Sequence, residues 1–402
     1  MKLKKLILIG LCCLLAGMFV ACPGGKDDMG YDPDEPVTLS MWSFTNELER
    51  PIEYFQERHP NITIELTIVP TEDYPTKLKP TLKSGENAPD IFTGEAAFIL
   101  DFVDAGYYDN LEQDPYNVDA SKLLEYTVDI GRGPDGNIAA LSWQATPGAI
   151  FYRRSMAIEY LGTDDPAVVA EHFATWEAML DTGRMIKEAS GGTVFLIPGI
   201  GDLQNMIMAQ RSNPWVVDGE LVIDQQMIDF LDIAKQFKDE GLEAQIGQWS
   251  PAWFDAMKAD SNVFTCLLPT WGLHYVMKPN APDSSGDWAA CSGPYNWYWG
   301  GTWLGVYANS EYKAQAWEFV KMMTLDDEFM TWWANETGDF LSNTDVVDAI
   351  KDDFSDEYLG GQNHYEYFYE AAKQIDGSLF SSYDQNLNGM YMNQLTLYIE
   401  DQ

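Results

Sequence analysis

VTLSMWSFTNELERPIEYFQERHPNITIELTIV, residues 37–69, is the stretch that decides the fold class of this chain. Its opening residues, 37–42, form an uncharged and largely apolar run, which predicts a buried strand. In residues 61–69 every second side chain is apolar, which predicts a half-buried strand. A helix that ends near Arg58 is predicted between the strands, because three apolar residues have the spacing of one helix face: Leu48, Ile52 and Phe55.

The same alternation of strand and helix continues along the chain. A helix is predicted before Gly85, and a short strand follows at residues 90–93. Four further elements are expected: strands at residues 138–141 and 193–197, a helix after Thr175, and a helix around residues 316–323. Strands that alternate with helices indicate an α/β fold with a mostly parallel sheet.

The first 21 residues have the layout of a secretory signal, with a lysine-rich start and the uncharged apolar run 6–21. Small Ala21 directly before Cys22 resembles the lipobox of bacterial lipoproteins, although Phe19 stands where that box usually has Leu. We therefore expect residues 1–21 to be a signal peptide that is removed, and Cys22 to carry a lipid. A short transmembrane anchor is the alternative, but this apolar run is marginal in length for spanning a bilayer.

Residues 22–36 are rich in Gly, Pro and Asp, which predicts a flexible tether between the lipid and the folded part. The lipid would anchor the chain outside the cytoplasm, on the outer face of the cytoplasmic membrane or in a periplasm. It would be the only contact of the chain with the membrane. This location argues against ATP-dependent chemistry and favours capture or hydrolysis of external material.

The exported part of the chain is strongly acidic. All 63 Asp and Glu residues follow Cys22, together with 21 of the 24 Lys and Arg residues, which gives a net charge of −42. This charge repels nucleic acid, so no nucleic-acid partner is expected. The 14 Trp residues favour recognition of a neutral ligand that has apolar faces.

Motifs for metal binding or nucleophilic catalysis are weak. The four His residues lack zinc-motif spacing, and neither a G-x-S-x-G nor a Walker A pattern occurs. Residues 384–389, DQNLNG, open like a calcium loop, but Leu395 stands where the bidentate Glu belongs, so a solvated loop is expected. Cys266 and Cys291 could form a disulfide in an exported chain or remain two separate buried thiols.

A series of short motifs extends nearly from end to end of the chain. They are VTLSMWSF, HPNITIELTIV, SGENAPDIFTGE, FVDAGYYDNL, PDGNIAALSWQATPGAIFYRRS, TWEAML, NVFTCLLPTWGL, WGGTWLGVYANSEYKAQAWEFVKMMT and TGDFLSNTDVV. Each motif alone is a weak pattern, but their joint order is specific. In this order the chain resembles the extracellular solute-binding proteins of carbohydrate ABC importers, the family that includes maltose-binding protein.

The resemblance implies an α/β fold of the two-lobe, periplasmic-binding-protein type (type II), with the ligand cleft between lobes joined by crossing strands. Residues 37–144 with 303–337 would form the N-terminal lobe, and residues 145–302 with 338–402 the C-terminal lobe. The chain would cross between the lobes three times, near residues 145–148, 300–303 and 338–341. Binding proteins of this type close on their ligand by hinge motion.

A carbohydrate site needs aromatic rings for the C–H faces of the sugar and polar side chains for its hydroxyl groups. Five aromatic residues lie within residues 295–303, interrupted by two glycines, and at least one of Trp299 and Trp303 is expected to face the ligand. By resemblance, Trp271 in LLPTWGL matches a stacking tryptophan of the family. It is the leading candidate for a ligand-binding residue.

Further candidates come from other segments. Phe44 and Asn46 follow the first strand, and open α/β sheets bind ligands at the carboxyl ends of strands. By resemblance, Glu95 after DIFTG matches a polar sugar contact. Thr146 stands where maltose-binding protein has a carboxylate, which indicates that this contact is weakened or replaced. Asp202 in GIGDLQN is another polar candidate.

The resemblance implies a lipid-anchored binding protein, not an enzyme, that delivers a carbohydrate, expected to be an oligosaccharide, to the permease subunits of an ABC importer. No cofactor or metal is implied, and a monomer is expected. One alternative keeps the fold but changes the ligand to a peptide or a polyamine, which the negative charge favours. The other alternative is a secreted glycoside hydrolase, which needs two carboxylates at a defined separation, and no motif indicates such a pair.

Overall fold

The stretch 37–69 folds as the strand–helix–strand unit that its pattern predicts. β1 (Val37–Ser43) and β2 (Ile62–Ile68) pair in parallel, and α1 (Glu49–Arg58) connects them. The structure is a computed structural model that describes residues 35–401. The predicted signal peptide, the lipid on Cys22 and most of the predicted tether therefore lie outside the described residues.

Five strands form the first sheet, in the order β2-β1-β3-β10-β4. β3 (Ile91–Glu95) is parallel to β1, whereas β10 (Thr302–Val306) is antiparallel to both β3 and β4 (Leu141–Ser142). A strand from late in the chain is thereby inserted between two strands from its first 142 residues. β4 is shorter than the predicted strand, because Ile138 makes only an isolated bridge.

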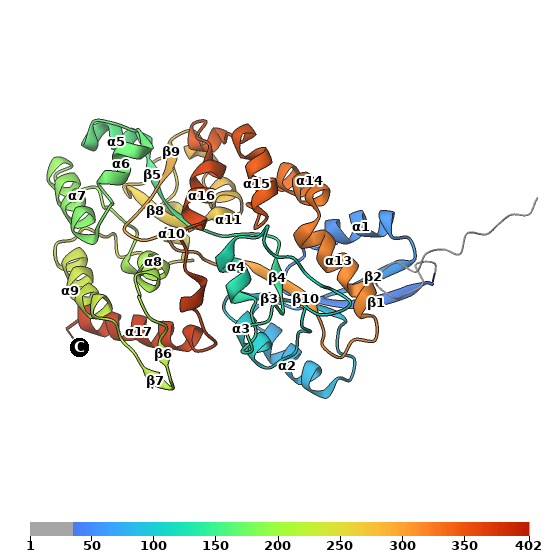
Figure 1. Cartoon of the computed structure of the whole chain (residues 1–402). Helices are drawn as coiled ribbons and strands as arrows, with labels where there is room; N and C mark the ends of the chain where they lie inside the picture. The colour runs from blue at the N-terminus through green and yellow to red at the C-terminus, as the bar shows by residue number, and fades with distance from the viewer. Residues whose placement is uncertain (1–34, 402) are drawn as a thin grey trace, which may run out of the picture.

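The second sheet has three antiparallel strands in the order β8-β5-β9. β5 (Gly148–Arg153) lies between β8 (Thr265–Pro269) and β9 (Trp288–Cys291), and all residues of the three strands are buried. Figure 1 shows the two sheets in separate halves of the molecule, with β1 to β3 and β10 on the right and β5, β8 and β9 on the left. The chain thus forms two α/β lobes, as expected.

Two buried cysteines lie on neighbouring strands of the second sheet but on opposite faces. Cys266 is opposite Phe151 and Cys291 is opposite Ile150, which are consecutive residues of β5. Consecutive side chains of a strand point to opposite faces of its sheet. Both thiols are free, so the alternative of two separate buried thiols is the one found.

Helices cover both sheets. With the first sheet lie α1, α2 (Tyr74–Ser84), α3 (Ile99–Asp104), α4 (Glu125–Ile130) and α13 (Lys313–Leu325). With the second lie α5 (Arg154–Leu161), α6 (Pro166–Glu171), α7 (Trp176–Ala189), α8 (Gln204–Ala209), α9 (Gln225–Asp239), α10 (Pro251–Asp255), α11 (Thr270–Gly272), α12 (Lys278–Asn280), α16 (His364–Ala372) and α17 (Asp384–Ile399). α14 (Asp327–Thr337) and α15 (Thr344–Ile350) lead from α13 toward α16. Among residues 35–401, no helix has the length and apolar character needed to cross a membrane.

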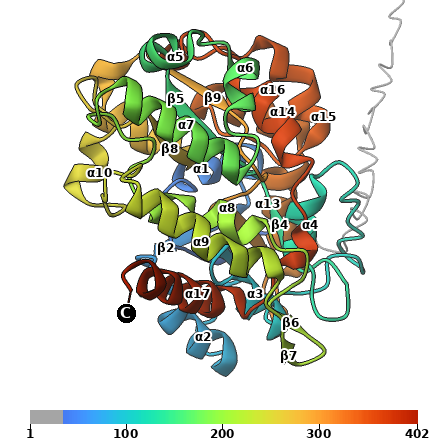
Figure 2. The same ribbon diagram turned by 90° about the vertical axis from the view of Figure 1, so that its left-hand side faces the viewer.

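Two predictions about local structure are wrong. Residues 193–197 make only isolated bridges, so they do not form a regular strand. Residues 384–389 begin helix α17, which packs along α9 in Figures 1 and 2, and they do not form a solvated loop. Asp384 is buried there and accepts a 2.6 Å hydrogen bond from Arg211, an ion pair that sequence spacing could not reveal.

Three chain segments run side by side where the lobes meet. The Ala145 N–H donates to the Phe340 carbonyl at 2.8 Å, and the Trp299 N–H donates to the Thr146 carbonyl at 3.1 Å. The segment around Ala145 is therefore held between the segment around Trp299 and the segment around Phe340. These are the places at which the chain is expected to cross between the lobes.

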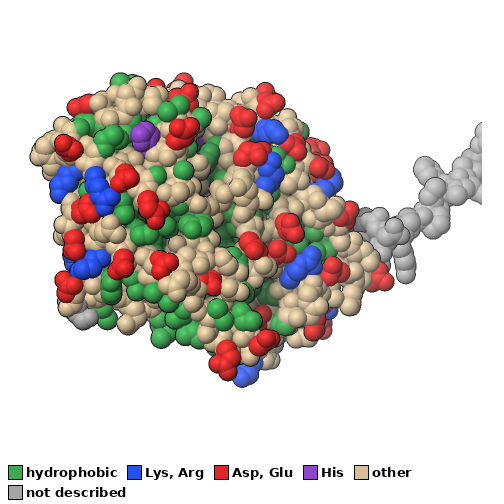
Figure 3. All heavy atoms as spheres, turned by 60° about the vertical axis from the view of Figure 1, so that its left-hand side comes forward, with side chains coloured by type: hydrophobic (Ala, Val, Ile, Leu, Met, Phe, Trp, Pro, Cys, Tyr) green, Lys and Arg blue, Asp and Glu red, His purple; other side chains and the backbone are tan. Residues whose placement is uncertain are grey.

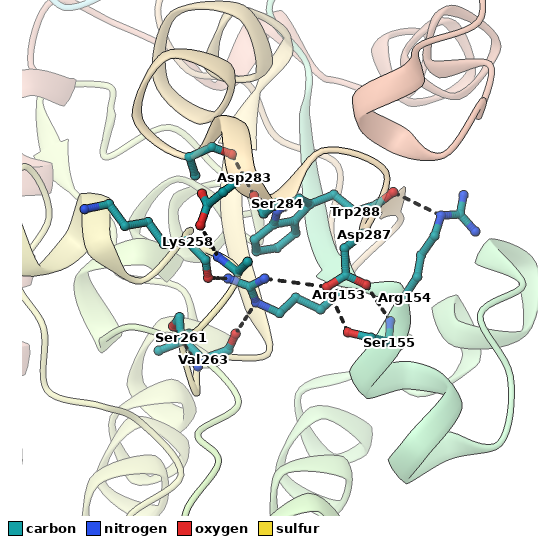
Figure 4. Close-up of polar contacts among 12 residues, drawn as sticks. Arg153, Arg154, Ser155, Lys258, Ser261, Val263, Asp283, Ser284, Asp287 and Trp288 are labelled. Atoms are coloured by element: carbon teal, nitrogen blue, oxygen red, sulfur yellow. Dashed lines mark hydrogen bonds and ion pairs between the residues drawn. The ribbon is translucent and has the colours of Figure 1, made fainter.

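A buried guanidinium ties together the loops at one end of the second sheet. Arg153, the last residue of β5, has a side chain only 1% exposed (Figure 4). Its Nε–H donates to the Val263 carbonyl at 3.2 Å, and Nη2 donates to the carbonyls of Ala256 and Lys258. The guanidinium also lies 3.6 Å from the Asp287 carboxylate and over the ring of Trp288. No local pattern in the sequence indicates this buried charge.

Candidate functional site

Three tryptophan rings meet where β8 ends beside the crossing segments. Trp271 lies in α11, directly after β8, and is half-buried. Its Nε1–H donates to the Trp299 carbonyl at 2.8 Å, and the two rings meet edge to face with centroids 5.2 Å apart. Trp249 lies parallel to Trp271 at 6.3 Å and meets Trp299 edge to face at 5.7 Å. These three residues are here named the tryptophan cluster.

Trp249 is the member of the tryptophan cluster that sequence reasoning missed. The residue is 51% exposed, and its φ of +63° is uncommon for any residue but glycine. Strained backbone of this kind tends to be retained at functional sites. The available signal is the stretch GQWSP, residues 247–251, in which a large apolar ring stands among turn-forming residues.

The first lobe contributes the ends of β1 and β3, which are parallel neighbours. Phe44 is half-buried and packs edge-on against Tyr74 and Phe98, with centroids 5.8 Å away in each case. Asn46 is exposed, and its carbonyl accepts a hydrogen bond from the Glu49 N–H at the start of α1. Of the two, Phe44 is held in one position by packing, while Asn46 has a side chain open to solvent.

Glu95 ends β3 at the boundary between the lobes. Its Oε2 accepts a 2.7 Å hydrogen bond from the Ala97 N–H, and burial raises the pKa of this carboxyl to about 7. A Cβ on Gly300 would stand 3.7 Å from Glu95 Oε1 and 3.0 Å from Trp271 Nε1. Glycine at position 300, with φ +77°, thus leaves room between the Glu95 carboxyl and the ring of Trp271.

A cavity of about 420 Å³ opens beside Trp299 and Glu95. Residues of both lobes line it, among them Glu95, Leu100 and Asp101 from the first lobe and Gln204, Met208, Arg211 and Trp299 from the second. Cavities of this size accommodate small ligands. Figure 3 shows hydrophobic side chains gathered toward the middle of one face of the molecule, with acidic side chains scattered around them.

One polar contact joins the loop after β1 to the second lobe. Burial raises the pKa of Glu47, and the side-chain interaction of its carboxyl with the Tyr275 hydroxyl partly opposes this rise. Tyr275 lies in a π-helical turn, η2 (Leu273–Met277), just after Trp271. Single π-helical turns are frequent at functional sites. No local pattern in the sequence indicates this pair, because the two residues are more than 200 positions apart.

Two candidate ligand residues lie in the interior. Trp303 is 1% exposed, and its Nε1–H donates to the Thr127 carbonyl at 2.7 Å, so its ring is part of the core beneath the crossing segments. Thr146 is also 1% exposed, and its hydroxyl donates to the Gly300 carbonyl at 3.0 Å. In this conformation Thr146 binds two crossing segments together, whereas Trp303 binds its segment to α4. Of the pair Trp299 and Trp303, only Trp299 lines the cavity.

Asp202 reaches the tryptophan cluster indirectly, through a hydrogen bond from Trp253. It is 3% exposed, and both carboxylate oxygens accept from the Trp253 Nε1–H, at 3.0 and 3.1 Å. Trp253 is fully buried, and its ring lies 5.1 Å from that of Trp249. The structure therefore places Asp202 behind the exposed ring of Trp249, where it positions aromatic residues and does not line the cavity.

Three carboxyl groups near the lobe boundary predict how stability depends on pH. Burial raises the pKa of Glu95, Asp202 and Asp339 to about 7, whereas unfolded carboxyls titrate near 4. Between these values the native state binds more protons than the unfolded state, so its stability falls as pH rises. Burial lowers the pKa of His274 and His364 to about 4, which acts in the opposite direction below pH 6.5, but the three carboxyls outweigh the two rings. Urea denaturation should therefore give a larger free energy of unfolding at pH 5 than at pH 8, by about 2–5 kcal/mol.

The variant Asp202→Asn is the control for this pH dependence. It removes one of the three titrating groups while the side chain keeps an oxygen that can accept from Trp253. The difference in unfolding free energy between pH 5 and pH 8 should therefore shrink in the variant. Greater stability of the unaltered chain at pH 8 than at pH 5 would contradict the prediction.

A known protein family matches most of the chain. The family described as bacterial extracellular solute-binding protein matches residues 52–358. Among solved structures, one described as extracellular solute-binding protein family 1 is 21% identical, with 91% of this chain and 95% of that chain covered and a TM-score of 0.81.

Two further similar structures belong to sugar-binding proteins. The sugar-binding protein MalE from Xanthomonas citri is 15% identical, with coverage of 91% and 93% of the two chains and a TM-score of 0.72. The galacto-N-biose-/lacto-N-biose I-binding protein of the ABC transporter from Bifidobacterium longum, in complex with lacto-N-biose, is 17% identical, with coverage of 92% and 95% and a TM-score of 0.71. At these identities the likeness concerns the fold, and it confirms the expected periplasmic-binding-protein architecture.

Proposed function

Because this chain belongs to the bacterial extracellular solute-binding proteins, a family that it matches over residues 52–358, we propose that it captures a carbohydrate and delivers it to an ABC importer. Members of this family are solute-binding proteins and not enzymes. The observation that carries the proposal is the tryptophan cluster, which lies beside Glu95 at the boundary between the two lobes.

The chemistry of the site fits a sugar. Rings of Trp249, Trp271 and Trp299 in parallel and perpendicular orientations offer flat apolar surfaces to the C–H faces of more than one sugar unit, which favours an oligosaccharide. Glu95, with a pKa of about 7, can accept a hydrogen bond from a sugar hydroxyl when ionised and donate one when protonated. A neutral, hydroxyl-rich ligand needs both properties in one site.

Capture would occur by closure of the lobes. We take residues 37–144 with 303–337 as one lobe and residues 145–302 with 338–402 as the other. The three hydrogen-bonded crossing segments would act as the hinge, because they are the covalent connections between the two sheets. The contact between Glu47 and Tyr275 joins the two lobes in addition to these segments.

A screen of mono- and oligosaccharides by thermal shift tests the function. A ligand present at 100 times its dissociation constant should raise the free energy of unfolding by about 2.7 kcal/mol. The ligand should be recovered chemically unchanged, and small-angle scattering should show a smaller radius of gyration when the protein is saturated. Release of reducing ends would favour a glycoside hydrolase, and absence of stabilisation by any carbohydrate would contradict the proposal.

A cationic ligand is the second candidate, because the exported chain has a net charge of −42 and Glu95 and Asp101 line the cavity. Spermidine and short basic peptides therefore belong in the same screen. Stabilisation by these compounds that disappears at high salt, with none by carbohydrates, would favour this candidate.

Replacing Trp271 or Trp249 with Ala should weaken carbohydrate binding by about 5- to 30-fold, because a lost stacking surface costs about 1–2 kcal/mol. Titration calorimetry measures the change. Trp332→Ala is the matched control, since Trp332 is also half-buried but stacks on Tyr54 of α1. If the Trp271→Ala variant and the unaltered chain bound carbohydrate with equal affinity, Trp271 would not be a ligand-binding residue.

The anchor on Cys22 is proposed together with the function. Cys22→Ser should abolish lipidation, so the variant should move from the membrane fraction to the soluble fraction after cell disruption. A single acyl chain holds a protein only weakly, so more than one chain is expected on the native residue. Mass spectrometry that finds an unmodified Cys22 in native protein would contradict the anchor.

A further inference from the structure

Two histidines and an aspartate from distant parts of the sequence meet in the second lobe. His274 lies in the π-helical turn η2, Asp356 precedes η5 (Glu357–Leu359), and His364 is the first residue of α16. One ring nitrogen of each His and one oxygen of Asp356 all lie within 4.8 Å of one another. These three residues are here named the His–Asp–His cluster. It stands apart from the cavity and does not rest on the proposed carbohydrate site.

His364 is a buried residue whose polar ring atoms lack partners in the described structure. The residue is 4% exposed, and in the described part of the chain neither Nδ1 nor Nε2 has a hydrogen-bond partner. Phe354, Tyr365 and Phe368 pack around its ring, so packing fixes its orientation. A buried imidazole without partners is unfavourable, and a bound ion is one of the few explanations for such a group.

The donor atoms of the three residues suit a metal ion. Each His offers one ring nitrogen and Asp356 offers one carboxylate oxygen to the cluster. Neutral imidazoles and a carboxylate are ligands that Zn²⁺ prefers.

A cation already lies at the cluster, in the form of the Lys278 ammonium. Its Nζ is 2.6 Å from Asp356 Oδ2 and 3.4 Å from His274 Nδ1. The Lys278 side chain is 34% exposed, so its head can rotate into solvent and leave an opening to the cluster. The place is thus electrostatically favourable for positive charge, and it has a route of entry.

We propose that His274, Asp356 and His364 form a binding site for a transition-metal dication of the Zn²⁺ type, which enters by displacing the Lys278 ammonium. Three protein ligands and one water molecule would complete a tetrahedral shell. Ligand atoms in such a shell are roughly 3.3 Å apart, so the present separations of up to 4.8 Å must contract through side-chain rotation.

A metal bound at the His–Asp–His cluster would lie next to a crossing segment. A Cβ on Gly338 would stand 2.7 Å from His274 Cε1, so His274 packs against the residue at which α14 ends and a crossing segment begins. The next residue, Tyr275, interacts with Glu47 of the first lobe. A metal bound to His274 would therefore hold the π-helical turn in place next to a crossing segment.

Zn²⁺ titration of the tag-free, chelator-stripped protein by calorimetry at pH 7.5 tests the site, with Co²⁺ absorption as a measure of coordination geometry. The expected result is one Zn²⁺ per chain and a four-coordinate Co²⁺ spectrum. Binding should be lost in His274→Gln, His364→Gln and Asp356→Asn. His172→Gln is the control and should bind normally, because His172 contacts Thr182 outside the cluster.

Lys278→Met provides a test that does not depend on the folding of the ligand variants. The substitution removes the competing cation, so Zn²⁺ affinity should rise about tenfold or more. Unchanged affinity in Lys278→Met would overturn the proposal. So would absence of Zn²⁺ uptake by the unaltered chain at submillimolar concentration, or uptake that persists in His364→Gln, which would indicate adventitious binding by surface carboxylates.

Discussion

Replacing Arg153 with Ala should lower the free energy of unfolding by about 3–5 kcal/mol, as expected when one partner of a buried charged network is removed. The guanidinium donates to the carbonyls of Val263, Ala256 and Lys258, and these oxygens would lose their donor without gaining water. The variant also loses the contact between the guanidinium and the ring of Trp288. Urea denaturation followed by tryptophan fluorescence measures the loss.

Arg184→Ala is the matched control for the substitution at Arg153. The Arg184 side chain is 40% exposed and pairs with Glu240 and Asp181 on the surface, so its loss should cost less than about 1 kcal/mol. If Arg153→Ala were as stable as Arg184→Ala, the carbonyl network would not contribute to stability as its geometry predicts.

Replacing Trp303 with Ala should cost about 3–5 kcal/mol of stability, because the change empties a large volume in the core. The ring is 1% exposed, and the Thr127 carbonyl would lose its hydrogen bond from Nε1. Affinity for carbohydrate, measured well below the melting temperature, should change little, because the buried ring does not contact the ligand. The two effects are separable by calorimetry and a denaturant melt on the same variant.

Trp299→Ala should show the opposite pattern. Its ring is half-buried and lies at the cavity, so the variant should lose affinity by about 5- to 30-fold while retaining most of its stability. A large loss of stability in Trp299→Ala, or a large loss of affinity in Trp303→Ala without loss of stability, would reverse the roles assigned to these residues.

Which of Trp299 and Trp303 is buried could not be predicted from the sequence, whereas the first two strands could. The parallel pair of β1 and β2 was predictable because apolar residues in these segments follow the periods of a strand and a helix. The segment WGGTW has no such period: Gly300 and Gly301 have φ of +77° and +106°, and positive φ angles break the alternation of side chains. Which ring faces the interior is therefore settled by tertiary contacts.

Residues that meet only through the fold were also out of reach. The His–Asp–His cluster joins His274 to residues 82 and 90 positions away, and the ion pair of Arg211 with Asp384 spans 173. No local motif encodes such distances. Trp271 could be singled out because it directly follows a buried strand, whereas Trp249 depends on a turn whose conformation places the ring beside Trp271.

The insertion of β10 between β3 and β4 has a consequence for how the chain folds. Leu304 pairs with Thr93 across more than 200 residues, so the first sheet stays incomplete until more than three quarters of the chain has emerged from the ribosome. Contacts this distant in sequence raise the contact order, and chains with high contact order fold slowly. A newly made chain would accordingly remain without its complete sheet during most of its synthesis, which is the condition that threading through a secretion channel requires.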